Sequence, residues 1–294
     1  MADPLRVVVR RGGVVEATHE VHAAAVRDGR LVASAGDPTL VTLLRSSAKP
    51  FQALPLARAY DDLDPRELAI ASASHLADDE QLEAVRMLLT RAKAGEDDLE
   101  CGPDGNPPSR LKHNCSGKHA GMLAVCRAHG WATKGYRLAS HAMQRTNLRD
   151  VAAAAGVDET SIPTAVDGCG VVTFALSLER MAAMFTRLEG TQEGVAIADA
   201  MRGHPDVIRG PQSTDSLLMK AIPGAVAKGG AEGLLCGTLP DGTGFALKSS
   251  DGGARPLRPA AAAFLAELGF DLPAFVELPL TNSRDERVGT IAAA

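Results

Sequence analysis

Several features that would place a protein in a broad class are missing from this chain of 294 residues. It contains no apolar run of the roughly eighteen residues that a membrane-spanning helix needs, and its N-terminal segment lacks the long apolar core of a secretion signal. No block of basic residues accompanies the net charge of −5. We therefore expect a cytoplasmic protein that binds small molecules and contacts neither membrane nor nucleic acid.

The sequence also lacks a cysteine spacing that would indicate disulfide pairs. The five cysteines are an odd number without a CxxC spacing, which argues against a disulfide scaffold and for reduced thiols. They are Cys101, Cys115, Cys126, Cys169 and Cys236. Any chemistry they perform would be metal binding or catalysis.

What is present is the pattern of a globular protein, with 45% hydrophobic residues. The N-terminal segment alternates apolar and polar residues and has turn signals at Gly12-Gly13 and Asp28-Gly29, which predict antiparallel strands. Strand patterns return in GLLCGTL and FALKSS, joined by turn residues 240–244. We expect the two ends of the chain to share one sheet.

Helical spacing dominates residues 51–206, and a last helix is expected over about 259–268. Two runs illustrate it: Leu82, Val85, Leu88, Leu89 and Ala92, and Val172, Leu176, Met181 and Phe185. The Gly- and Pro-rich stretch 95–110 predicts a long loop that either borders a site or is a plain surface excursion. The fold prediction is a single α/β domain, residues 1–294, whose antiparallel sheet carries helices on its faces.

The stretch RSSAKPFQ places Ser46 and Lys49 on one helical face, where a buried, partly neutral lysine could accept the serine proton. Pro50 restricts both to a first helical turn, with Ser46 near the N-cap. The alternative is a helix cap beside a solvated lysine. Ser-x-x-Lys is a short pattern that also occurs by chance, as at Ser109 to Lys112.

A second group lies in HNCSGKHAG, where His113, Cys115, Lys118 and His119 fall within seven residues. A further sulfur could come from Cys169, which lies between glycines. Two sulfurs and one nitrogen would leave an open position, as catalytic zinc sites do. Buried structural thiols or a Cys–His nucleophile pair are the alternatives.

Three weaker signals remain. Ser74 and His75 end an apolar run, although adjacent side chains point apart. Lys248 follows the hairpin and could project from the sheet toward the helices, or be an exposed edge-strand lysine. The stretch KGGAEG, residues 228–233, permits a close backbone approach to a substrate or is merely a turn.

Taken together, these motifs make the chain similar to the rhizobial, inducible type of L-asparaginase. SSAKPFQALP, ASASH, HNCSGKHAGML, DGCGV-x-TFA, KGGAEG and ALKSSDGG occur in this order over nearly the whole length. The resemblance implies a fold like that of serine β-lactamases and penicillin-binding proteins, and hydrolysis of L-asparagine to aspartate and ammonia. It also implies a homodimer.

The resemblance further implies which residues act. Two Ser-Lys pairs would be catalytic, a zinc ion would lie beside them, and three residues would line the substrate site. The implied catalytic residues are Ser46, Lys49, Ser74 and Lys248, the zinc ligands Cys115, Lys118 and Cys169, and the substrate-binding residues Arg45, His119 and Asp167, the last for the α-amino group. Lysine can ligate a metal only after losing its proton.

The chain departs from the family pattern at two places. Leu76 to Glu80 stand where a serine or glycine followed by an acidic residue is expected, and Val172 replaces an expected proline. A related Ser-Lys amidase, esterase or β-lactam-recognising hydrolase is the rival enzyme. A ligand-binding or zinc-storage protein that lost activity is the rival from another class.

Overall fold

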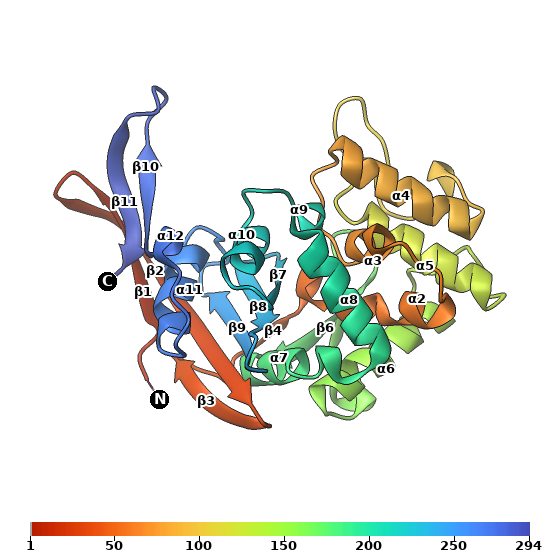
Figure 1. The fold of residues 1–294 in the computed structure, drawn as a ribbon, viewed down its shortest axis with the longest axis horizontal. Helices are drawn as coiled ribbons and strands as arrows, with labels where there is room; N and C mark the ends of the chain where they lie inside the picture. Colours follow the sequence, from red (N-terminus) through yellow and green to blue (C-terminus); the bar gives the residue numbers. More distant parts are fainter. Residues whose placement is uncertain (1) are drawn as a thin grey trace.

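The computed structural model describes residues 2–294, and its strands form one large and one small antiparallel sheet (Figure 1). The large sheet has the order β10-β11-β1-β2-β9-β8-β7, with β3 paired to β2 on the side away from β9. Its strands are β1 (Leu5–Arg11), β2 (Val14–Arg27), β3 (Arg30–Ala35), β7 (Val226–Gly230), β8 (Leu234–Thr238), β9 (Gly244–Ser249), β10 (Glu277–Thr281) and β11 (Arg287–Ala293). The small sheet consists of β4 (Val41–Leu43), β5 (Thr164–Val166) and β6 (Val172–Ser177).

The two ends of the chain share the large sheet, as the sequence predicts. Strand β1 pairs with β11, with Val7 opposite Ala293. The predicted turn at Asp28 and Gly29 joins β2 to β3, and both residues have positive φ, 52° and 72°. Two such residues in succession give a type I′ turn, whose twist matches that of paired strands. This sheet is the frame on which one wall of the site is built.

Helices occupy the chain between the two sets of strands and part of its C-terminal region. The α-helices are α1 (Lys49–Gln52), α2 (Leu54–Ala59), α3 (Pro65–Ala71), α4 (Asp79–Ala92), α5 (Ser116–Ala128), α6 (Ala142–Ala155), α7 (Leu178–Phe185), α8 (Gln192–Gly203), α9 (Pro205–Ile208), α10 (Thr214–Ala221), α11 (Leu257–Ala266) and α12 (Pro273–Val276). The 3₁₀ turns are η1 (Arg45–Ala48), η2 (Glu96–Asp98), η3 (Glu159–Ser161) and η4 (Leu188–Gly190). No helix within residues 2–294 is long and apolar enough to cross a membrane.

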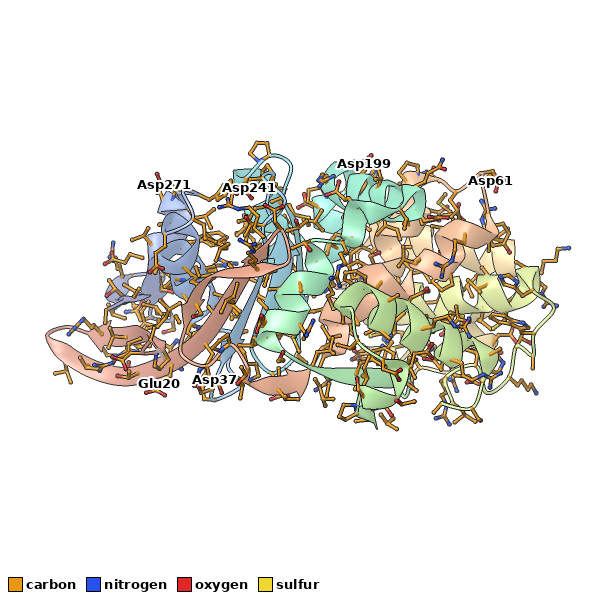
Figure 2. The ribbon with its side chains drawn as sticks, turned by 90° about the horizontal axis from the view of Figure 1, so that it is seen from below. Glu20, Asp37, Asp61, Asp199, Asp241 and Asp271 are labelled. Carbon is orange, nitrogen blue, oxygen red and sulfur yellow. The ribbon has the colours of Figure 1, made fainter. Side chains whose placement is uncertain are left out.

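Helices cover the large sheet, which confirms the expected α/β architecture. Helix α7 packs against β2, β8 and β9, and α11 packs against β1, β9 and β11. Every residue of β8 is buried, so both faces of the sheet are covered there. Figure 1 shows most other helices gathered beyond the β7 end of the sheet, and Figure 2 shows the same division from below, with labelled acidic side chains such as Asp61 and Asp271 spread along the surface.

One predicted helix is partly a strand. Val172 and Leu176 lie on β6, where they are buried, and the helix begins only at Leu178 after Ser177 as its N-cap. A short apolar run that is buried on all sides has no clear period, so spacing alone cannot separate strand from helix there. The expected helices over 82–92 and near 259–268 are present as α4 and α11.

Candidate active site

The site lies where strand β7, at one edge of the large sheet, meets the helices. Turn η1 packs on β6, β7 and β8, and α10 packs on β7. A cavity of about 310 Å³ opens here. Its charged and hydroxyl-bearing lining includes Ser46, Ser74, Arg209, Asp215, Glu232 and Arg258. This volume is at the lower end of small-molecule sites, and it suits a ligand of amino-acid size.

The stretch RSSAKPFQ forms η1 and the first turn of α1, with Pro50 in that turn as predicted. Ser46 is half-buried and lines the cavity, and its hydroxyl has no hydrogen-bond partner within residues 2–294. The cap position expected for it is wrong, because the 3₁₀ turn begins one residue earlier and Leu44 is its N-cap. The next serine, Ser47, is fully buried and donates to the Lys228 carbonyl at 2.9 Å.

Ser74 lies between two lysine amines. Its Oγ is 3.0 Å from Lys49 Nζ and 3.0 Å from Lys228 Nζ. Both lysines are fully buried, and Ser74 is 3% exposed. One hydroxyl can therefore exchange a proton with either amine, which is the arrangement expected for proton transfer around a nucleophile.

The lysine beside Ser74 is not the one that the family resemblance implied. Lys248 lies on β9 as expected, but it is partly exposed and its Nζ donates to the Ser249 carbonyl. Strand β9 is internal to the sheet, between β2 and β8, whereas β7 is the edge strand next to α10 and η1. The position on the edge strand brings Lys228 to the cavity, and the pairing of Ser74 with Lys248 is corrected to Lys228.

Burial makes both amines easier to deprotonate. Desolvation lowers the pKa of the Lys228 amine to about 7, against the opposing effect of Asp215. Desolvation also lowers the pKa of Lys49, with Cys115 acting in the opposite direction. The Asp215 carboxylate lies 3.5 Å from Lys228 Nζ. A lysine that is partly neutral near pH 7 can accept a proton, which an exposed lysine cannot do at that pH.

The predicted zinc ligands come together next to this lysine–serine group. Lys118 Nζ is 3.1 Å from Cys169 Sγ, and all three predicted ligands are no more than 4% exposed. A hydrogen bond from Cys169 lowers the pKa of Cys115 well below that of a free thiol. Burial lowers the pKa of Lys118, but the two sulfurs and the Asp167 carboxylate together outweigh burial and raise it on balance. Within residues 2–294, no three His, Cys, Asp or Glu side chains form a metal-binding group.

The three predicted substrate-binding residues border the sulfur cluster. Arg45 Nε donates to Asp167 Oδ1 at 2.6 Å, and Arg45 lies 4.0 Å from Glu232. His119 is fully buried, and its Nδ1 is 2.8 Å from the Tyr136 hydroxyl. Its Nε2 has no partner within the described residues. None of the predicted three is part of the cavity lining, so they flank it rather than form it.

The sequence analysis did not identify Lys228 as a reactive group, and it gave no role to Asp215, Arg209 or Arg258. KGGAEG was noted only for its glycines, although its lysine follows an apolar pair in a strand-like run. Loop 95–110 contributes nothing to the cavity lining, and one isolated bridge pins Asp104 to Ser109. Leu99 and Cys101 within it are fully buried, so the stretch packs partly into the core and does not border this cavity.

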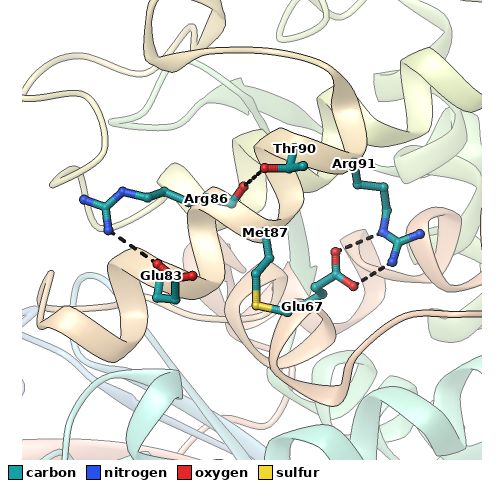
Figure 3. Close-up of a pocket in the computed structure, with 6 residues that line it drawn as sticks. All are labelled: Glu67, Glu83, Arg86, Met87, Thr90 and Arg91. Carbon is teal, nitrogen blue, oxygen red and sulfur yellow. Dashed lines mark hydrogen bonds and ion pairs between the residues drawn. The ribbon is translucent and has the colours of Figure 1, made fainter.

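A larger surface pocket, of about 440 Å³, lies elsewhere on α3 and α4 (Figure 3). Its charged side chains pair with one another, Glu67 with Arg91 at 2.9 Å and Glu83 with Arg86 at 3.8 Å. The Thr90 hydroxyl donates to the Arg86 carbonyl. The groups in this pocket are thus engaged in structural contacts, and size alone does not make it the reactive site.

A protein-family model described as L-asparaginase II matches residues 7–293. No curated protein matches the chain. Similar solved structures include a putative β-lactamase from Bacteroides dorei, 11% identical with a TM-score of 0.45, covering 84% of this chain and 93% of that one. A β-lactamase from Mycobacterium bovis is 14% identical with a TM-score of 0.39, covering 84% and 94%.

Proposed function

This chain belongs to the L-asparaginase II family and is an asparaginase-type hydrolase, and we propose that it converts L-asparagine and water to L-aspartate and ammonia with a serine–lysine group. The observation that carries the proposal is the Ser74 hydroxyl held at 3.0 Å by two buried lysines, next to the unpaired Ser46 in one cavity. The reactive residues are Ser46, Lys49, Ser74 and Lys228, with Lys228 in place of Lys248.

Ser46 is the nucleophile in this mechanism. Its half-exposed hydroxyl can reach a substrate, whereas Ser74 is engaged by both amines. Ser46 Oγ attacks the side-chain amide carbon while its proton passes to the neutral Lys49 amine. Ser74 then relays a proton to the amide nitrogen, the carbon–nitrogen bond breaks, and ammonia leaves. Water attacks the resulting ester and releases aspartate, and the proton returns to Ser46.

The sulfur cluster suits a zinc ion, which the family resemblance implies. Cys115, Cys169 and Lys118 supply two sulfurs and one nitrogen, a donor set that zinc accepts, and leave a fourth position open. A bound zinc would act there as a Lewis acid toward a polar substrate group. Lys118 would have to release its proton on binding, so zinc affinity rises with pH.

Substrate recognition is assigned to the charged residues around the cavity. The Asp167 carboxylate would accept the α-amino group of the substrate, while Arg45 holds that carboxylate in place at 2.6 Å. His119, with an unpartnered buried Nε2, would bind a polar substrate group or the metal site from below. We also expect the homodimer that the resemblance implies, which light scattering on the purified protein tests. The cytoplasmic location expected from the sequence stays a prediction.

The function is tested by ammonia release from L-asparagine. Ser46→Ala removes the nucleophile, so turnover should fall to the background of the assay. Ser109→Ala is the matched control, because Ser109 begins the other Ser-x-x-Lys pattern and its hydroxyl donates to Glu96 away from the site. No ammonia from the parent protein, in a panel where esters or β-lactams are hydrolysed, would contradict an asparaginase.

A further inference from the structure

The Lys228 amine is held by three oxygen atoms, and one of them belongs to a carboxylate outside the serine–lysine group. Its Nζ is 3.0 Å from Ser74 Oγ, 2.7 Å from the Gly229 carbonyl and 3.5 Å from Asp215 Oδ2. Lys228 and Asp215 are 0% and 2% exposed. A buried ion pair of this kind is costly to form, and removing one partner leaves an uncompensated buried charge.

Asp215 is fixed to the strand that carries Lys228. Its Oδ2 accepts a hydrogen bond from the Gly229 N–H at 3.1 Å. A Cβ atom at position 229 would lie 3.3 Å from the same oxygen, a closer approach than most side chains make. The carboxylate therefore sits directly against the β7 backbone, and it has little freedom to move away from the amine.

Charged groups face Lys228 from several elements. Asp215 comes from α10, Lys49 from α1, Arg209 from the end of α9 and Cys115 from the start of α5. Asp215 supplies the carboxylate of this set, and Lys49 and Arg209 bring further positive charge. Without Asp215, two buried amines would share the Ser74 hydroxyl with no carboxylate beside them.

We propose that Asp215 is the positioning residue of the hydrolytic reaction, whose carboxylate aims the Lys228 amine at Ser74 and offsets the charge of the two buried lysines. The inference rests on the proposed function of this site. Asp215 acts through Lys228 and does not itself exchange protons with the substrate. Substitutions at Asp215 should therefore change how the site responds to pH as well as how fast it works.

The expected direction follows from the sign of the charges. A nearby carboxylate favours the protonated amine, so its loss lets Lys228 release its proton at lower pH, by about one to three pH units for an opposite charge at this range. In the parent protein we expect kcat/KM to rise through about pH 7, where Lys228 loses its proton. When the Lys228 amine is neutral, Lys49 can take up the Ser46 proton without a second ammonium group on the other side of Ser74.

The kinetic test compares kcat/KM against pH for the parent, Asp215→Asn and Asp215→Glu. In Asp215→Asn the rise should move to lower pH while the plateau falls about a hundredfold, since the amine is no longer aimed. Asp215→Glu keeps the charge, so its rise should stay near the parent's pH with a lower plateau. The proposal is overturned if Asp215→Asn lowers the plateau of kcat/KM without moving its rise along the pH axis. It is also overturned if the rise of Asp215→Glu moves to lower pH, as it should only when the charge is lost.

A second measurement needs no turnover. The protonation of Lys228 can be followed by NMR of protein with ¹⁵N-labelled lysine side chains, with the signal assigned by its disappearance in Lys228→Met. Asp215→Asn should move the Lys228 midpoint to lower pH, and an unchanged midpoint overturns the role of Asp215. If the parent protein releases no ammonia, the proposed function fails while this titration still decides the role of Asp215. Should Asp215→Asn not fold, Asp215→Glu must keep the parent midpoint.

Discussion

Ser74 is the side chain on which the proposed chemistry depends most. Its two amine partners come from positions far apart in the chain, Lys49 before it and Lys228 well after it. Spacing pointed to Ser46 and Lys49, whereas Ser74 and Lys248 were implied by the family resemblance, and neither route gave a role to Lys228. Both lysines lie on antiparallel strands of one sheet, and only the strand order shows which of them borders the cavity.

Replacing Lys228 or Lys248 by methionine shows which of the two is the partner of Ser74. Lys228→Met should lower kcat/KM for L-asparagine by about 10²–10⁴, the range typical of a lost proton-transfer group. Lys248→Met is the matched control and should keep most of the activity, because Lys248 is partly exposed and makes no hydrogen bond to Ser74. Full activity in Lys228→Met would contradict the role of Lys228, and a loss of activity in Lys248→Met alone would favour the pairing with Lys248 that the family resemblance implies.

Close packing of α3 against α5 holds Ser74 near the sulfur cluster, since Ser74 follows α3 and Cys115 precedes α5. A Cβ at Gly117 would lie 2.3 Å from the Ile70 carbonyl, whereas one at Gly121 would meet its neighbours at 3.4 Å. The two glycines share one helix but have very different room. The approach of the helices therefore depends on position 117.

Alanine at these two glycines tests that packing. Gly117→Ala forces the helices apart, which should cost about 1–3 kcal/mol of unfolding free energy and reduce turnover. Gly121→Ala should be tolerated, because alanine favours a helix over glycine by about 1 kcal/mol and ordinary contacts remain. Urea unfolding with the asparagine assay measures both. Equal stability of the two variants would mean that the α3–α5 contact does not position the site.

Local signals predicted the elements that local physics determines. The Asp28-Gly29 turn needs two positive φ values, and α4 has its capping box at Asp78 and Gln81 together with helical spacing. The helix predicted over residues 172–177 was wrong, because burial on both faces leaves no regular spacing of apolar and polar residues. Helix and strand could thus be told apart from the sequence where one face of the element meets water, but not where both faces are buried.

The assembled fold brings the two sulfurs together from separate segments, Cys115 before α5 and Cys169 in the turn between β5 and β6. The sequence raised Cys169 only as one possible further sulfur, and the family resemblance named it as the partner of Cys115. Asp215 and Arg209 were beyond sequence reasoning. They reach the cavity only through the packing of α10 on the edge strand β7 and of α9 on α10 and α3.

Zinc that bridges these segments should stabilise the folded chain. A ligand at a hundredfold excess over its Kd adds about 2.7 kcal/mol, so zinc should raise the melting temperature of the parent by several degrees. Cys169→Ser should lose this response. Cys126→Ser is the control, because Cys126 is a buried thiol on α5 that lies outside the predicted ligand set. An equal zinc response in all three proteins would contradict the proposed site.

The most direct test of the central claim is to identify the residue that carries the acyl group during turnover. The protein is mixed with L-asparagine, quenched in acid within the first turnovers, digested and examined by mass spectrometry. The proposed mechanism predicts an aspartyl ester on the peptide that contains Ser46, and none in Ser46→Ala. An ester on Ser74, or ammonia release with no ester on either serine, would contradict it.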